Sequence, residues 1–454
     1  MDLKGKKVIV MGAGISGISA VRLLLDIGGI PVLFDENEKL DRAKVTGQLG
    51  GEEIEIVTGT LPEKMLQTAS LLVMSPGIPV DTPFVERFHK AQIPVWGEIE
   101  LAYQYAKGDV IAITGTNGKT TTTALTGKIM EDYYGKSYVV GNIGAPYTAA
   151  ALDTKNGEVT VAEISSFQLE TIHHFHPRIS AILNITPDHL NRHHTMENYV
   201  ACKEAVARNQ TFADVCVLNY ENDYTREFAK RCPAKVLFFS SGQQLEEGIY
   251  LQGEEIMYAD GRSTRKLLNI HEMKLLGLHN VENVMAAIGM ALAYGVPEPS
   301  VVKSVKEFTA VEHRIEYVAT VRGVDYYNDS KGTNPDAAIK GIQAMNRKTV
   351  LIGGGYDKDS AYDEWIESFD GKVNWLVLLG QTREKIADCA RAHGFQNIIL
   401  TDSLEEAVRV SASKAGEGEA VLLSPACASW GMFANYEERG RMFKELVKKL
   451  EKEG

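Results

Sequence analysis

At 454 residues the chain is too long for a single hydrophobic core, and its length alone suggests about three domains. Apolar residues make up 44% of the sequence, and the formal net charge of −12 argues against nonspecific nucleic-acid binding, which requires a positive surface. No apolar run approaches the roughly 20 residues of a membrane span, and Val8–Met11 is too short for a signal peptide. We therefore expect a cytoplasmic protein without a membrane span.

The chain has five cysteines, and none of them is in C-x-x-C spacing. An odd number without that spacing argues against a disulfide framework and against a zinc site built from cysteines. This usage is typical of a reducing cytoplasm.

The first 97 residues are predicted to form an α/β unit. Val8–Met11 reads as a strand, Gly12–Gly17 as a G-x-G-x-x-G turn into a helix, and Pro31–Phe34 as the next strand. Asp35 follows 18 positions after the last glycine. The pattern predicts a pyrophosphate-sized anion site at a helix N-terminus, which suits a nicotinamide cofactor or a uridine diphosphate sugar. A tight turn without a ligand is the structural alternative.

A second loop of this unit follows the predicted strand Leu71–Met74 and has the sequence Ser75-Pro-Gly-Ile-Pro79. Open α/β sheets bind ligands at the carboxyl ends of their strands, where this loop would lie. Val95–Glu98 is predicted to be the hinge to a central domain that runs to residue 310.

The central domain begins with a glycine-rich loop between a strand and a helix. Val110–Ile113 predicts a buried strand, and the helix is expected to continue through Met130. Lys119 and Thr120 stand where a phosphate loop needs a lysine for the terminal phosphates and a hydroxyl for Mg²⁺. The strict motif would place a glycine at position 113, so this is a variant loop; the alternative is an ordinary glycine turn.

Strands and helices alternate through the rest of the central domain, which predicts a mainly parallel sheet. The predicted strands are Val139–Val140, Val159–Ala162, Ala181–Ile185, Val215–Leu218 and Val236–Phe239. Residues 240–275 are polar and strand-like. Leu278–Ile288 reads as a helix with Asn280 and Asn283 one turn apart.

Three residues of the central domain are candidates for a metal cluster with Thr120. Glu163 and His189 follow predicted strands, so both should lie near the phosphate loop, although a surface carboxylate and a structural histidine are the alternatives. Lys203 would ordinarily be solvated, but a neutral lysine amine near metal and phosphate can also take up CO₂ as a carbamate.

The third domain, residues 311–454, alternates in the same way. Its predicted strands are Asp325–Asn328, Thr349–Ile352, Trp375–Leu379 and Ala420–Leu423. Polar loops follow three of them, namely Asn328–Asn334, Gly353–Lys358 and Ser424–Ser429.

Together these motifs resemble the Mur ligases of bacterial cell-wall synthesis, which are ATP-dependent amide-forming enzymes. The resemblance covers all three domains and rests on Thr114–Thr120, Glu163–Glu170, Asn184–His189, Lys203, Leu278–Asn283 and His313-Arg314. It implies a Rossmann-like domain at 1–97, a P-loop-type parallel sheet at 98–310 and a Rossmann-like α/β domain at 311–454. The loops Gly12–Gly17, Ser75–Pro79, Asn328–Lys331 and Ser424–Ser429, with Arg439-Gly440, are most similar to the branch that adds D-glutamate to UDP-N-acetylmuramoyl-L-alanine.

The resemblance also implies a role for individual residues. ATP would be bound by Gly115, Thr116, Asn117, Gly118, Lys119, Thr120, Thr121, Asn280, Asn283, Arg314 and Asp329, the last on the ribose. The UDP substrate would be bound by Gly14, Ile15, Ser16, Ser75, Asn142 and His189, and D-glutamate by Thr333, Lys358, Ser429 and Tyr436. Two Mg²⁺ sites would draw on Thr120, Glu163, His189 and Lys203 as a carbamate, and the catalytic set would be Lys119, Glu163, His189 and Lys203.

The implied chemistry has two steps, in peptidoglycan precursor synthesis. The substrate carboxylate attacks the γ-phosphate of ATP to give an acyl phosphate, and the amine of D-glutamate then displaces phosphate. One site must collect three substrates and exclude water, so the third domain is expected to close on the central one in a monomeric enzyme.

Three other functions are consistent with parts of the sequence. A nicotinamide-dependent oxidoreductase would use Gly12–Gly17 and Asp35 but leaves the Gly118-Lys119 loop unexplained. A sister Mur ligase with another amino acid, or a folylpolyglutamate synthetase, would share the ATP site. A non-enzymatic nucleotide switch would bind ATP without forming an amide.

Overall fold

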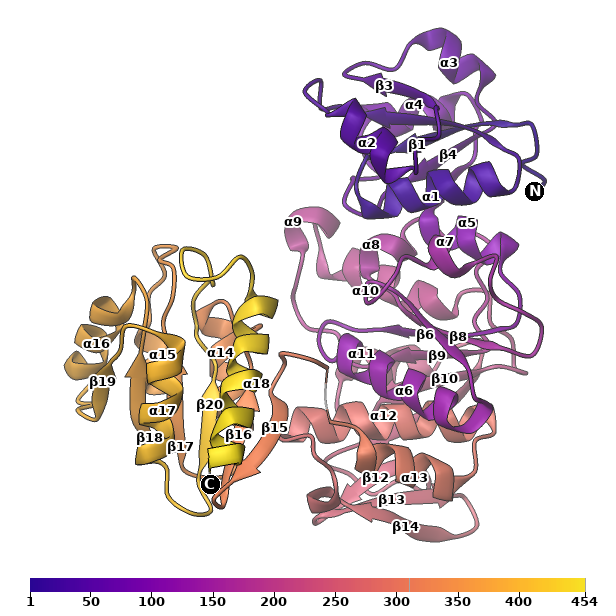
Figure 1. Cartoon of the computed structure of the whole chain (residues 1–454). Helices are drawn as coiled ribbons and strands as arrows, with labels where there is room; N and C mark the ends of the chain where they lie inside the picture. The colour runs from indigo at the N-terminus through magenta and orange to yellow at the C-terminus, as the bar shows by residue number, and fades with distance from the viewer. Residues whose placement is uncertain (310, 454) are drawn as a thin grey trace. The chain divides into compact units, whose positions relative to one another are not determined.

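The computed structural model describes residues 1–309 and 311–453 of the chain. It divides into two compact units, the first made of Met1–Asn269 with Glu282–Val305 and the second of Ile270–Val281 with Lys306–Gly454. Both are α/β structures in which helices cover open sheets (Figure 1). The predicted domain boundary at residue 310 and the final residue, 454, lie outside the described residues.

The N-terminal sheet has five parallel strands in the order β3-β2-β1-β4-β5. Its strands and helices are β1 (Lys7–Met11), α1 (Ile15–Asp26), β2 (Ile30–Asp35), α2 (Arg42–Gln48), β3 (Glu55–Thr58), α3 (Glu63–Thr68), β4 (Leu71–Met74), α4 (Pro83–Lys90) and β5 (Val95–Gly97). The strand order reverses between β1 and β4, which pair directly. The loops that follow these two strands therefore lie at a topological switch point, where such sheets bind ligands.

The central sheet has nine strands in the order β14-β13-β12-β11-β10-β9-β6-β8-β7. Its parallel strands are β6 (Asp109–Thr114), β7 (Ser137–Gly141), β8 (Val159–Glu163), β9 (Ile179–Ile182), β10 (Val215–Asn219) and β11 (Lys235–Ser240). Strand β6 lies between β8 and β9, so the carboxyl ends of these three strands are neighbours. This topology brings the segments that carry the phosphate loop, Glu163 and Asn184–His189 to one edge of the sheet.

Helices and an antiparallel ribbon complete the central part. The helices are α5 (Glu98–Tyr105), α6 (Lys119–Tyr134), α7 (Tyr147–Ala150), α8 (Ser166–Leu169), α9 (Leu190–His193), α10 (Met196–Glu204), α11 (Asp223–Ala229), α12 (Leu278–Tyr294) and α13 (Glu298–Glu307), with 3-10 turns at Ala205–Ala207 and Ile270–Glu272. The polar stretch predicted to be strand-like forms β12 (Glu247–Gln252), β13 (Glu255–Asp260) and β14 (Thr264–Asn269). The last three strands are antiparallel to one another and extend the sheet past β11.

The sheet of the second unit has the order β15-β16-β20-β17-β18-β19, parallel except for the β15–β16 pair. Its elements are β15 (Glu316–Val321), β16 (Val324–Asn328), α14 (Pro335–Ala344), β17 (Thr349–Gly353), α15 (Asp363–Glu367), β18 (Val373–Leu378), α16 (Arg383–Ala392), β19 (Ile398–Leu400), α17 (Leu404–Lys414), β20 (Ala420–Leu423) and α18 (Tyr436–Glu453). Strands β16, β20 and β17 are neighbours, so the three polar loops that were predicted from the sequence leave the sheet side by side.

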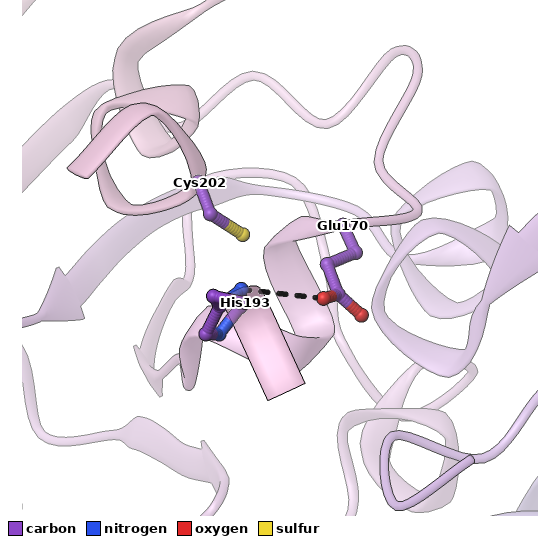
Figure 2. A group of neighbouring side chains, drawn as sticks. All are labelled: Glu170, His193 and Cys202. Atoms are coloured by element: carbon purple, nitrogen blue, oxygen red, sulfur yellow. Dashed lines mark ion pairs between the residues drawn. The ribbon is translucent and has the colours of Figure 1, made fainter. Parts of the chain in front are cut away.

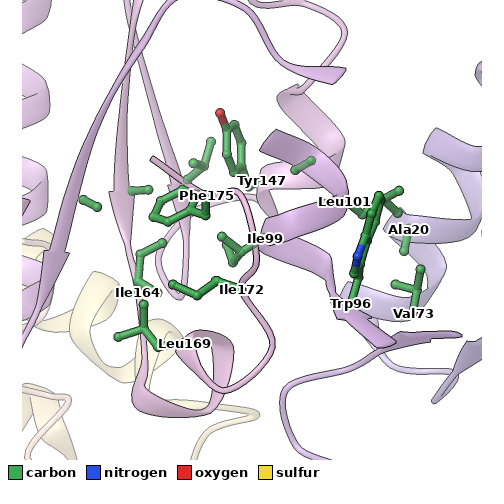
Figure 3. Packing of buried hydrophobic residues seen from close by; sticks show 14 of the residues in the cluster. Ala20, Val73, Trp96, Ile99, Leu101, Tyr147, Ile164, Leu169, Ile172 and Phe175 are labelled. Atoms are coloured by element: carbon green, nitrogen blue, oxygen red, sulfur yellow. The ribbon is translucent and has the colours of Figure 1, made fainter. Parts of the chain in front are cut away.

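One hydrophobic core joins the N-terminal sheet to the central domain. Figure 3 shows Trp96, the middle residue of β5, packed toward Ala20 and Val73 on one side, with Ile99 and Phe175 farther along the same cluster. The core continues from the first strands to the central sheet because α5 follows β5 without a linker. A polar contact adds to it: the Thr148 hydroxyl donates to Ser19 at 2.7 Å.

The fold class predicted from the sequence, three-part α/β with mainly parallel sheets, is confirmed. Some predicted strands differ in extent. Strand β9 is Ile179–Ile182, where residues 181–185 were predicted, and β18 is Val373–Leu378, where residues 375–379 were predicted. The five cysteines are free thiols, and no described helix is both long and apolar enough to cross a membrane.

Candidate nucleotide and substrate site

The phosphate loop lies between β6 and α6. Gly118 caps α6 in the left-handed region (φ +85°), and a Cβ there would lie 2.1 Å from Oδ1 of Asn283, so only glycine fits. Asn117 donates its backbone N–H to Oδ1 of Asn184 at 2.8 Å. Thr120 and Thr121 occupy the first turn of α6, where a helix N-terminus favours anions.

Two lysines meet at one carbonyl oxygen of this loop. Lys119 Nζ donates to the Gly115 carbonyl at 2.9 Å and to the Thr116 carbonyl at 3.0 Å. Lys203, on α10, donates to the same Gly115 carbonyl at 2.8 Å and is 2% exposed. Burial, with the nearby charge of Lys119, lowers the pKa of Lys203 to about 7. Lys203, one of the predicted partners of the phosphate loop, is therefore in direct contact with it.

Glu163 ends β8 beside the loop and is 1% exposed. Oε1 accepts a hydrogen bond from Asn142 at 3.2 Å, whereas Oε2 is buried and has no hydrogen-bond partner among the described residues. A buried carboxylate oxygen without a partner is energetically unfavourable unless a ligand satisfies it. This observation fits a cation ligand, and the same contact brings together Glu163 and Asn142, both predicted site residues.

His189 lies at the N-cap of α9 with a positive φ of 52°. Its ring is half-exposed and lies 4.9 Å from the ring of Phe167. Arg192, on the same short helix, donates to the carbonyl of Ile78 at 2.8 Å and pairs with Glu170. The predicted histidine is thus carried by a segment that is tied to the Ser75–Pro79 loop of the first domain.

The glycine loop of the first domain is tightly built. A Cβ on Gly17 would lie 1.8 Å from the Gly12 carbonyl oxygen, whereas nothing lies within 4 Å of a Cβ on Gly14. Gly14 therefore leaves the backbone open to a ligand, and Ile15 beside it is 78% exposed. Ser16 is in the first turn of α1, and the Ser75 hydroxyl, from the neighbouring loop, lies 2.8 Å from the position of a Gly12 Cβ.

The carboxylate of Asp35 is already used inside the protein. Oδ2 accepts from the backbone N–H of Ala13 at 2.9 Å, and Oδ1 accepts from Asn37 N at 2.9 Å. The acidic residue after β2 therefore stabilises the glycine loop itself, which accounts for the sequence pattern without a nicotinamide ribose.

In the second unit, Asp329 follows β16, and its side chain is buried. Oδ2 accepts from Ser424 Oγ at 2.7 Å and Oδ1 from the Ile315 N–H at 3.3 Å. Burial raises the pKa of Asp329 to about 7. Arg314 precedes Ile315 in a stretch with positive φ on both sides of it, at His313 and Ile315. The structure brings the predicted Asp329 and Arg314 to the same edge of this sheet.

The residues predicted for D-glutamate also belong to the loops at this edge. Ser429 is buried after β20, Thr333 follows β16, and Lys358 lies with its Nζ 4.7 Å from the ring of Trp430. Tyr436 begins α18, and its carbonyl accepts from Ser330 Oγ at 2.7 Å.

Arg439 and Tyr199 support the site but are absent from the predicted set. Arg439 is 2% exposed and donates to the carbonyls of Ser330 (2.8 Å) and Cys427 (3.1 Å), which fixes two of the loops. Tyr199 is buried, with its hydroxyl 3.0 Å from Thr116 Oγ1. The Arg439-Gly440 pair was visible as a motif, whereas Tyr199 carries no sequence signal apart from its position four residues before Lys203.

Three family models match consecutive parts of the chain. They describe a Mur ligase MurD-like N-terminal domain (residues 6–97), a Mur ligase middle domain (113–291) and a Mur ligase glutamate ligase domain (313–427). Among solved structures, UDP-N-acetylmuramate-alanine ligase of Thermotoga maritima aligns with a TM-score of 0.59 at 20% identity, over 98% of this chain and 99% of that one. MurF of Acinetobacter baumannii aligns with 0.60 at 15%, over 98% and 93%. At such identities these two likenesses show the fold alone.

The chain belongs to the Mur ligase family, and the resemblance inferred from its motifs is confirmed. UDP-N-acetylmuramoylalanine--D-glutamate ligase of Lachnospira eligens is 59% identical over 450 residues, which is 99% of this chain and 100% of the relative. The enzyme of the same name from Lachnoclostridium phytofermentans is 54% identical over 454 residues and the full length of both.

Proposed function

We propose that this chain is an ATP-dependent ligase that joins D-glutamate to UDP-N-acetylmuramoyl-L-alanine in peptidoglycan precursor synthesis. Full-length relatives of that name at 54–59% identity support the substrate pair. The observation that carries the chemistry is the convergence of Lys119 and Lys203 on the Gly115 carbonyl, at the edge of the sheet where β8 delivers Glu163.

In this proposal the phosphate loop binds the triphosphate of ATP. The backbone N–H groups at the start of α6 surround the phosphates, and Lys119 moves from the loop carbonyls to the β- and γ-phosphates. Asn280 and Asn283 on α12, of which Asn283 packs against Gly118, would bind the nucleotide, as would Arg314 and Asp329.

Thr120, Glu163, His189 and Lys203 as a carbamate would hold two Mg²⁺ ions. The unpartnered Oε2 of Glu163 and the hydroxyl of Thr120 are hard oxygen donors, which suit this ion. The bound ions would neutralise charge on the transferring phosphoryl group. Lys203 is suited to carbamylation because its lowered pKa keeps a neutral amine accessible near pH 7.

The reaction then follows from positioning and charge neutralisation. The carboxylate of the muramoyl substrate attacks the γ-phosphorus, ADP leaves, and an acyl phosphate forms. The amine of D-glutamate attacks the acyl carbon, and phosphate leaves from the tetrahedral intermediate. Lys119 stabilises the negative charge that develops in the first step.

The remaining predicted residues bind the other two substrates. Gly14, Ile15, Ser16 and Ser75 would bind the uridine diphosphate at the switch point of the first sheet, and Asn142 and His189 the muramoyl end. Lys358, Thr333, Ser429 and Tyr436 would bind D-glutamate, with the lysine cation paired to a carboxylate. We further propose a cytoplasmic monomer.

The test is phosphate release by the purified chain with ATP, Mg²⁺ and UDP-N-acetylmuramoyl-L-alanine. D-Glutamate, L-glutamate, L-lysine and meso-diaminopimelate are compared in parallel, with the product identified by mass. Release only with D-glutamate, accompanied by an amide product, supports the proposal. Release with another amino acid would assign a sister activity, and no release with any of them would refute the ligase function.

A further inference from the structure

A cluster of three metal-binding side chains lies outside the set proposed for Mg²⁺. It consists of Glu170, immediately after α8, His193, the last residue of α9, and Cys202 on α10 (Figure 2). The ligand atoms of all three lie within 4.8 Å of one another. His193 is 5% exposed, and the side chain of Glu170 is 12% exposed, so the cluster is largely inside the protein.

The distances suit a small tetrahedral ion. His193 Nδ1 and Glu170 Oε1 are 3.5 Å apart, as the dashed line in Figure 2 marks. Two ligands of one Zn²⁺ ion, each bonded at about 2.0–2.3 Å, are roughly 3.3–3.6 Å apart in a tetrahedron. The thiol of Cys202 points into the same space and needs to move by about 1.5 Å at most to reach this separation.

Each of the three side chains is held by a further contact. His193 Nε2 lies 2.9 Å from Ser166 Oγ, which leaves Nδ1 facing the cluster. The Cys202 thiol donates to the carbonyl of Ser166 at 2.9 Å. Arg192 donates to both oxygens of Glu170, from Nη2 to Oε2 and from Nε to Oε1 at 3.3 Å, so a metal ion would replace the second of these bonds. Such outer contacts orient metal ligands before the ion binds. The charge of Arg192 opposes a cation, so we expect weaker binding than at a site of cysteines alone.

We propose that Glu170, His193 and Cys202 form a Zn²⁺ site distinct from the Mg²⁺ cluster. A thiolate, an imidazole and a carboxylate together select zinc over magnesium, which takes oxygen ligands. The bound ion would connect α8, α9 and α10, and it would thereby fix the short helix whose N-cap is His189. The cysteine spacings gave no sign of this site because only one of its three ligands is a cysteine.

The site can be tested by spectroscopy on the full-length protein. Co²⁺ is titrated into the reduced chain in excess Mg²⁺, and thiolate-to-cobalt charge-transfer absorption is recorded. We expect one equivalent to give the absorption and Zn²⁺ to abolish it. Cys202→Ser and His193→Gln should both lose it. Cys389→Ser is the matched control, since Asp363, Cys389 and His393 form a comparable but more exposed cluster, and it should keep the absorption.

A measurement on the unmutated protein guards against variants that fail to fold. Alkylation of each cysteine is followed by peptide mass mapping with and without Zn²⁺, and Zn²⁺ should protect Cys202 but not Cys389. No cobalt absorption in the wild-type chain, absorption that survives Cys202→Ser, or protection confined to Cys389 would each overturn the proposal. None of these readouts depends on ligase activity.

Discussion

Lys119 is the side chain on which the proposed phosphoryl transfer most depends. Replacing it by alanine should lower the rate of ATP-dependent phosphate release at least about a hundredfold, as loss of a group that stabilises transition-state charge does elsewhere. The fold should survive, since Lys119 Nζ donates to two carbonyls of its own loop. Initial rates and circular dichroism check both expectations.

Lys128 provides the control for that substitution. It lies on the same helix, pairs with Asp132 four residues on, and is about one-third exposed. Lys128→Ala should retain nearly full activity. Equal losses in the two variants would contradict a specific role for Lys119.

The proposed carbamate on Lys203 can be tested by chemical rescue. Lys203→Ala should lose activity, and added acetate or formate should restore part of it, because a small carboxylate can replace the two carbamate oxygens. Lys203→Arg is the comparison, since its guanidinium keeps the positive charge and cannot be carbamylated. Rates measured against carboxylate concentration decide the matter, and an absence of rescue in the alanine variant would reject the carbamate.

At the scale of the element, helix α5 contains two buried glutamates with opposite titration behaviour. Burial raises the pKa of Glu98 to about 7, although Gln168 donates to it. Burial also acts on Glu100, but backbone N–H groups from His173, His174 and Phe175 outweigh it and lower its pKa.

These shifts predict opposite dependences of stability on pH. Between pH 4.5 and about 7 the folded state retains the proton of Glu98 that the unfolded state loses, so this residue's contribution to stability falls as pH rises. Relative to Glu98→Gln, the free energy of unfolding of the wild-type chain should fall by on the order of 3 kcal/mol at most across that pH window. Glu100 contributes stability above its unfolded pKa and loses it as pH falls.

Denaturation midpoints in urea at pH 5.5 and 8 measure both effects. The free energy of unfolding of Glu98→Gln, relative to that of the wild type, should increase with pH. Glu100→Gln should be less stable than the wild type at pH 8. Parallel pH trends in the two variants would contradict the assignment.

The elements that the sequence predicted well are those buried on both faces. Val8–Met11 and Leu71–Met74 are continuous apolar runs in the middle of the N-terminal sheet, and burial alone identifies them. Strands β3 and β15 had no such signal, because these edge strands bury only part of their surface and carry mixed residues. Edge strand β19 is apolar but only three residues long.

The site also has a part that the sequence could predict and a part that it could not. Site residues in the loops after strands could be predicted, because the carboxyl ends of parallel strands lie at the same edge of the sheet. The Glu163–Asn142 contact and the meeting of Lys119 with Lys203 at Gly115 required coordinates, since helix α10 is far from the loop in sequence. The individual ligand roles stay predictions.

At the scale of the whole molecule, the proposed ligands of ATP come from both compact units. The phosphate loop and Asn283 belong to the first unit, and Arg314 and Asp329 to the second. One nucleotide can contact all of them only if the units come together around it. We expect small-angle scattering to report a smaller radius of gyration with an ATP analogue and the UDP substrate than without them. Identical curves would count against closure.

The shared carbonyl of Gly115 has a consequence for proton exchange. Because the charge of Lys119 contributes to the low pKa of Lys203, an anion that neutralises Lys119 should raise that pKa. In the uncarbamylated protein near pH 7, nucleotide binding should therefore draw protons from the buffer. Its affinity should weaken as pH rises through about 7. Calorimetry in buffers of different ionisation enthalpy would measure the number of protons taken up when the nucleotide binds. That number reports how far a phosphate bound at Lys119 raises the pKa of Lys203.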